Sequence, residues 1–101
     1  MDTKTLIAES KARFAHNSAK AYLTEKYNAK LIVAAQGGLW RADTNIIAFF
    51  ASSVYIHVVM IDSFNNPVKV NRLELLEVLE NTYNKVMEEW VTEWTELESK
   101  R

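Results

Sequence analysis

The chain has 101 residues, a formal net charge of -1 at pH 7 and no cysteine, and 49% of its residues are hydrophobic. This length corresponds to one domain, and the low glycine and proline content argues against a disordered chain. Without cysteine the chain excludes disulfides, zinc–thiolate sites and thiol catalysis, and a nearly neutral balance argues against binding to a nucleic-acid backbone.

The N-terminus lacks the charged and then apolar pattern of a signal peptide. The longest apolar run, Ile46 to Ile61, is interrupted by Ser52, Ser53 and His57 and is too short to span a bilayer. We therefore expect an intracellular protein that does not contact a membrane.

The first predicted element is a helix over residues 3–28. Small residues recur along one stripe at helical spacing, which favours close approach to another element; they are Ala8, Ala12, Ala15 and Ala19. Asp2 or Thr3 can cap the start of this helix, and Asn28 is a plausible end.

A β-hairpin follows. The apolar run Leu31 to Ala35 predicts one strand, Gly37-Gly38 a two-residue turn, and Leu39 to Ala42 the returning strand. Asp43 can then cap a short helix over residues 44–51, for which a strand is the alternative.

The segment Val54 to Ile61 predicts the clearest strand. Both of its faces are largely apolar, so we expect it at the centre of a sheet. Turn-forming residues fill Asp62 to Pro67, and Val68 to Val70 predicts the last strand. The expected fold class is α+β, a two-layer domain with an antiparallel sheet flanked by the N-terminal helix and a long C-terminal helix.

The C-terminal helix is the strongest prediction and covers residues 71–99. Asn71 and Glu74 form a capping-box pattern at its start, and Lys100 and Arg101 suit its negative end. At ~1.5 Å per residue it would be roughly 43 Å long, whereas a compact domain of this size has a radius of gyration of ~13 Å. We therefore expect one domain over 1–101, with this helix extending beyond it.

The distal half of this helix supplies the candidate interaction residues, namely Tyr83, Met87, Trp90, Val91, Trp94 and Leu97. Two tryptophans one turn apart need a cover, because large exposed apolar patches usually mark contact sites. A second copy of the chain is the favoured cover, and the first helix running alongside is the alternative.

Charge is distributed unevenly along the chain. Residues 1–30 hold six basic and three acidic side chains, and residues 71–101 hold eight glutamates and four basic side chains. We expect the basic helix to lie beside the acidic one, within one chain or across a dimer.

Candidate chemistry is sparse. His16 and His57 lie on different elements without a second ligand at metal spacing, and His57 is expected to be a core or interface residue. We predict no catalytic residue, no metal and no cofactor, so the chain is expected not to be an enzyme. Trp40 and Arg41, with Lys30 and Lys69, could form a small platform that stacks on a nucleotide base, although core packing is the default for Trp40.

Two stretches of the sequence carry a resemblance to a known class of proteins. They are Gly37 to Phe50, and Asp62 to Arg72 followed by Tyr83 to Trp90. They resemble small proteins encoded by large tailed bacteriophages of the myovirus type. The resemblance covers about half of the chain and carries no activity and no site residue. It implies a product found in the cytoplasm of an infected bacterium or in the virion.

Together these observations predict a non-enzymatic protein–protein interaction or assembly protein of phage type. We expect a homodimer or higher homo-oligomer formed through the C-terminal helix, with a host or virion protein as a possible further partner. The alternative is a small nucleic-acid or nucleotide binder that uses Trp40, Arg41 and the nearby lysines.

Overall fold

A computed structural model describes residues 3–100. Its elements, in chain order, are α1 (Thr3–Lys30), β1 (Ile32–Ala35), β2 (Gly38–Arg41), α2 (Thr44–Ser52), β3 (His57–Ile61), β4 (Pro67–Asn71) and α3 (Arg72–Ser99). The fold is α+β, with an N-terminal helix, two small antiparallel sheets and a long C-terminal helix, as the sequence predicts. Asp2 and Arg101, which were expected to act on the helix ends, lie outside the described residues.

The four strands form two separate hairpins. β1 pairs with β2, and β3 pairs with β4. The prediction that the strand ending at Ile61 is central was therefore wrong, because β3 has a neighbour on one side only. The strand is also shorter than predicted, since Val54, Tyr55 and Ile56 precede it as exposed, irregular chain.

The first hairpin turns one residue earlier than predicted. Ala35 pairs with Gly38, so the turn residues are Gln36 and Gly37, which have φ of 50° and 79°. Positive φ at both central residues is typical of a hairpin turn that matches strand twist. Gly38 belongs to β2, where its lack of a side chain leaves room for the Trp40 ring. A Cβ at this position would lie 2.6 Å from Trp40 Cζ2.

The segment 44–51 is helical, which decides between the two alternatives. The Asp43 carboxylate accepts a hydrogen bond from the Ile46 amide at 3.0 Å, as a helix N-cap does. Phe50 of this helix is fully buried in the core.

Side chains join the two hairpins. One Asp62 carboxylate oxygen accepts from the amides of Phe64 and Asn66, and the other accepts from the Leu39 amide of β2 at 3.1 Å. On the other side, the Gln36 amide group pairs with the backbone of Asn71. The Asn71 N–H donates to Gln36 Oε1 at 2.6 Å, and Gln36 Nε2 donates to the Asn71 carbonyl at 3.1 Å.

This contact also modifies the predicted cap of α3. Asn71 Oδ1 accepts from the Glu74 amide at 3.1 Å, so Asn71 is the N-cap as predicted. The Asn71 N–H, which a capping box assigns to the Glu74 carboxylate, donates to Gln36 instead. Tertiary structure thus replaces one half of a local motif.

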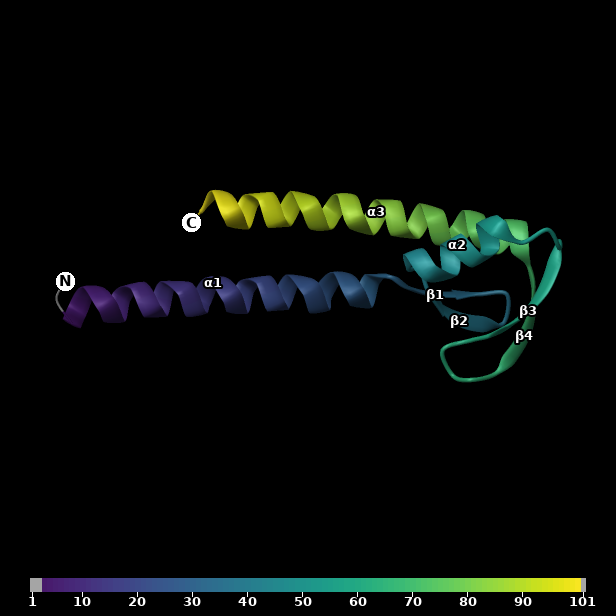
Figure 1. Cartoon of the computed structure of the whole chain (residues 1–101), viewed down its shortest axis with the longest axis horizontal. Coiled ribbons are helices and arrows are strands. Elements are labelled where there is room, and N and C mark those ends of the chain that lie inside the picture. Colours follow the sequence, from purple (N-terminus) through teal and green to yellow (C-terminus); the bar gives the residue numbers. More distant parts are fainter. Residues whose placement is uncertain (1–2, 101) are drawn as a thin grey trace.

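The two long helices run side by side, away from the strands (Figure 1). The chain measures 65 × 24 × 19 Å, with a radius of gyration of 19.4 Å. The core lies at the strand end, where α1, both hairpins, α2 and the first half of α3 meet. Its largest fully buried side chains are Trp40, Tyr27, Phe50, Leu75, Leu79 and Val70.

Candidate interaction surface on the long helices

The arrangement of α1 beside α3 explains much of the α3 sequence. The Tyr27 and Trp90 rings stack with centroids 5.8 Å apart and an interplanar angle of 12°. The ammonium group of Lys20 lies 4.7 Å from the centre of the Trp94 ring, a cation–π geometry. Of the two covers considered for these tryptophans, the structure shows the first helix of the same chain.

Ion pairs connect the basic helix to the acidic one, as expected. Lys26 Nζ lies 2.6 Å from Glu93 Oε1, Lys30 Nζ lies 3.2 Å from Glu89 Oε2, and Lys20 Nζ lies 3.4 Å from Glu98 Oε1. His16 Nε2 also contacts Glu98 Oε1 at 3.2 Å. Because α1 and α3 supply opposite charges along their shared seam, these pairs favour one alignment of the two helices.

Glu93 is the most engaged of these glutamates. It accepts hydrogen bonds from the Lys26 ammonium and from the hydroxyl of the buried Tyr27. These two bonds lower the pKa of Glu93, and the bond to Glu93 raises the pKa of Lys26 and of Tyr27. The buried phenol therefore has a charged acceptor, and no buried polar side-chain atom in residues 3–100 lacks a hydrogen-bond partner.

The six predicted interaction residues share one side of α3 and differ in how far α1 and the core cover them. Trp90 stacks on Tyr27, and Leu97 lines a groove together with Ala19 and Leu23 of α1, so both face the helix pair. Tyr83, Met87 and Trp94 are half-buried, whereas Val91 is 58% exposed. Tyr83, Met87, Val91 and Trp94 follow one another at spacings of four, four and three, on the same side of the helix as Trp90. Tyr83 and Met87 pack against the core, and Val91 is the exposed member. We call these four residues the α3 stripe.

The base-stacking platform is not assembled. Trp40 is 1% exposed, and its indole N–H donates to the Ala35 carbonyl at 2.9 Å, so its ring is a core element. The Arg41 guanidinium donates to Asn28 Oδ1, and Lys30 pairs with Glu89. These contacts support the default explanation, core packing, and no observation favours the nucleotide-binding alternative.

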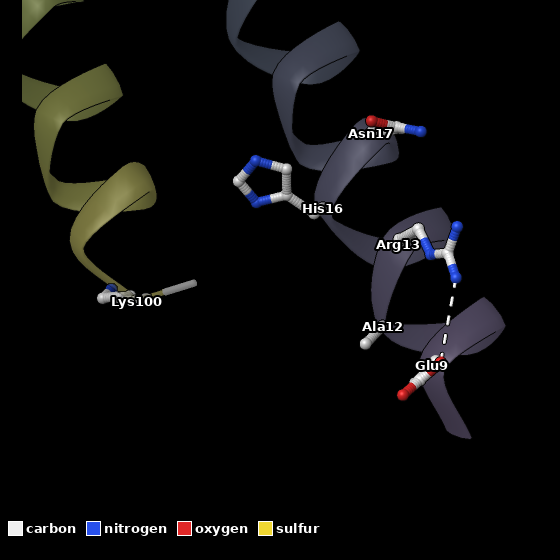
Figure 2. A pocket seen from close by; sticks show the side chains of 6 residues that line it. All are labelled: Glu9, Ala12, Arg13, His16, Asn17 and Lys100. Atoms are coloured by element: carbon white, nitrogen blue, oxygen red, sulfur yellow. Dashed lines mark ion pairs between the residues drawn. The ribbon is translucent and has the colours of Figure 1, made fainter. Parts of the chain in front are cut away.

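A cavity of about 530 Å³ lies where α1 passes the end of α3. Figure 2 shows its six lining residues, five from α1 and Lys100 from the end of α3. Two of its polar side chains already have partners, since Arg13 lies 3.9 Å from Glu9 and His16 contacts Glu98. We interpret this cavity as a shallow groove beside the turns of α1 that pass the end of α3.

Other chemistry is confined to single residues. Within residues 3–100 no group of three or more His, Cys, Asp or Glu could hold a metal ion, and no helix is long and apolar enough to cross a membrane. His57 is exposed on β3, so the expectation of a core position was wrong for this residue.

The sequence reasoning missed a second apolar surface, around β3. The two apolar faces of Val54 to Ile61 predicted a central strand, although an apolar run also fits an exposed contact surface. The structure leaves Val54, Tyr55 and Ile56 at least 56% exposed. The absence of charged residues was the sequence signal for this surface. Only the strand pairing shows that the run is exposed rather than buried.

Searches of protein-family models, curated proteins and solved structures find no match to this chain.

Proposed function

We propose that this chain is a non-enzymatic assembly protein of tailed-phage type that self-associates through the α3 stripe. Within such an assembly, surfaces left free would contact a host or virion protein. The bacteriophage origin, with a place in the infected cytoplasm or the virion, rests on the resemblance of the two sequence stretches alone.

The observation that carries this proposal is that a single chain has more accessible surface than a compact monomer of the same mass. A folded monomer of 11.6 kDa has an accessible surface of roughly 5,800 Å² on the usual scaling with mass. The chain exposes 7116 Å². The excess of roughly 1,300 Å² exceeds the ~800 Å² that one partner buries in a standard interface.

Large apolar side chains also remain exposed. Within residues 3–100, fifteen large hydrophobic side chains are exposed, whereas ten hydrophobic residues are buried in the core. Val91 lies on the distal half of α3 next to the half-buried Met87 and Trp94. Burying Val91 against another helix would therefore form a continuous apolar contact along α3. Helix pairing through such a contact is a common way to join identical chains.

The test is solution mass, measured by light scattering coupled to size exclusion. Val91→Glu with Trp94→Glu places two carboxylates in the α3 stripe, and we expect the mass of the assembly to fall at least twofold. Trp90 is left intact because its ring stacks on the buried Tyr27 of α1, whereas the contact of Trp94 with α1 is to the half-buried Lys20 ammonium.

The matched control is Val78→Glu. Val78 is 40% exposed on the opposite side of α3, and this variant should keep the wild-type mass. An unchanged mass for the stripe variant, with its helix content intact by circular dichroism, would show that α3 does not mediate self-association.

A further inference from the structure

Exposed apolar side chains concentrate around β3. Six of the fifteen exposed large hydrophobic residues lie between positions 54 and 64, namely Val54, Tyr55, Ile56, Val59, Ile61 and Phe64. No charged residue occurs between Asp43 and Asp62. This surface lies at the far end of the molecule from the two chain termini (Figure 1), so it is separate from the distal half of α3.

The backbone of β3 offers a complete set of free hydrogen-bonding groups. The Arg72 amide donates to the Ile56 carbonyl and the Asp62 amide to the Asn66 carbonyl, which fixes the even-numbered residues as those facing β4. In an antiparallel ladder alternate residues face opposite edges. His57, Val59 and Ile61 therefore direct their N–H and C=O groups to the outer edge, where no strand of the described chain pairs with them.

The outer edge of β4 differs from that of β3 in its charge and in its free backbone groups. Pro67 has no N–H to donate, Lys69 carries a charge, and both backbone groups of Asn71 are taken by the Gln36 side chain. Proline, lysine and a covered backbone are the usual protections of an edge strand. The β3 edge has none of these protections, although an unprotected apolar edge is a template for pairing with another chain.

We infer that β3 pairs edge to edge with β3 of a second copy of this chain, antiparallel and with the two-fold axis at Val59. In this register Val59 lies opposite Val59 of the other copy, and His57 lies opposite Ile61. All three residues present their backbone groups to the edge, so the donors and acceptors of the two copies match. The result is a four-stranded sheet in the order β4–β3–β3–β4.

The partner strand is β3 of a second copy rather than a charged peptide, because two uncharged apolar edges are compatible with each other. The facing segments carry no Asp, Glu, Lys or Arg, and this register places His57 opposite an isoleucine. Val59, which is 63% exposed, would lie opposite Val59 of the copy, and Ile61, which is 59% exposed, would lie diagonally beside that residue on the same face of the sheet. Cross-strand contacts between β-branched side chains stabilise such sheets.

This pairing does not rest on the proposed function, because it uses the opposite end of the molecule. A chain with both contacts joins into assemblies of at least four copies, since each contact is two-fold and neither blocks the other. Two standard interfaces would bury ~1,600 Å² on each chain, so the excess of roughly 1,300 Å² accommodates both contacts when the one between two five-residue strands is smaller than standard.

The first test uses charge at the two-fold axis. Val59→Lys and Val59→Glu each place like charges directly opposite one another, which is destabilising, so each variant alone should lose the β3 contact. Mixing the two variants in equal amounts should restore it, because opposite charges then meet. Val59→Thr keeps a β-branched side chain without charge and should behave as the wild type.

Mass distinguishes this contact from the helix contact. With the α3 stripe disrupted by Val91→Glu and Trp94→Glu, the chain should be a dimer of twice 11.6 kDa, and adding Val59→Lys should give the 11.6 kDa monomer. Were Val59→Lys to leave this dimer intact, or were the mixture of Lys and Glu variants to stay apart, the inference would be overturned. Neither outcome bears on the α3 stripe.

Amide hydrogen exchange tests the register residue by residue. In the dimer the amides of His57, Val59 and Ile61 should be protected, and Val59→Lys should release them by at least tenfold. The amides of Val58 and Met60, which bond to β4, should stay protected in both. Equal exchange of Val59 in the wild type and in Val59→Lys would contradict the pairing.

Discussion

At the scale of single residues, Trp40 holds the first hairpin to the core. Its ring is buried, its N–H donates to the Ala35 carbonyl within the same hairpin, and it occupies the space beside Gly38. The ring is large and surrounded by protein, so it has little freedom to shift. This residue, which could have been a ligand platform, serves as structure.

Gly38→Ala should therefore destabilise the fold. The new Cβ would lie 2.6 Å from the Trp40 ring, and relieving such overpacking typically costs about 1–3 kcal/mol. A urea titration followed by tryptophan fluorescence measures this loss.

Gly37→Asn is the control for Gly38→Ala. Nothing lies within 4 Å of a Cβ at Gly37, and asparagine tolerates its positive φ, so the change should stay within about 0.5 kcal/mol. Equal losses for the two variants would mean that the turn, and not the Trp40 contact, sets the requirement for glycine.

At the scale of elements, the pairing of α1 with α3 combines a short apolar seam with ion pairs. Only Leu23 and Tyr27 of α1 are buried, and residues 3–15 are exposed throughout. Helices in proteins gain most of their stability from tertiary packing, so the α1 half that lacks such packing depends on the contacts further along the helix. Glu93 is central to these contacts, because it bonds to both Lys26 and Tyr27.

Glu93→Gln should loosen the helix pair in a pH-dependent way. The pKa of Glu93 is lowered by Lys26 and Tyr27, so its contribution is present above the ordinary carboxyl pKa of ~4.3 and is lost as pH falls through the lower folded value. The pKa of Lys26 is raised by Glu93, so that contribution is present below ~10.4 and is lost as pH rises through the higher folded value.

The difference in urea midpoint between wild type and Glu93→Gln should therefore be largest between about pH 5 and 10 and should shrink in acid. Glu96→Gln changes an exposed glutamate on the same helix and should show little difference at any pH. A Glu93→Gln loss that persists undiminished at pH 2 would rule out the ion pair as its cause.

At the scale of the whole molecule, the chain is a rod with a globular end. Its radius of gyration of 19.4 Å exceeds the ~13 Å of a compact domain of about 100 residues. Two apolar surfaces remain uncovered in the single chain. One lies on α3, along the rod, and the other lies on β3, at the globular end. These are the two surfaces that the proposed contacts would bury.

Small-angle scattering tests this shape. The monomer with Val59→Lys, Val91→Glu and Trp94→Glu should keep a radius of gyration near 19.4 Å. The matched comparison is the same monomer at increasing salt, which screens the exposed ion pairs. A value near ~13 Å would mean that the helices fold back onto the strand end.

Local sequence patterns were enough to predict the existence and type of most elements. The spacing of apolar residues and the caps at Asp43 and Asn71 act within a few residues, so local physics decides them. The opposite charges of the first and last helices likewise predicted that these helices pair. Boundaries shifted by a few residues, as at Asn28, where α1 continues to Lys30.

Only the tertiary structure decided which apolar segments are covered. An uncharged run such as Val54 to Ile61 has the same composition whether it lies inside a sheet or along an open edge, because composition does not specify the neighbour. Likewise Trp90 has the same helical position whether α1 or a second copy covers it, and the fold of α1 beside α3 selects the former. The distinction depends on contacts between residues far apart in the chain, which local patterns do not encode.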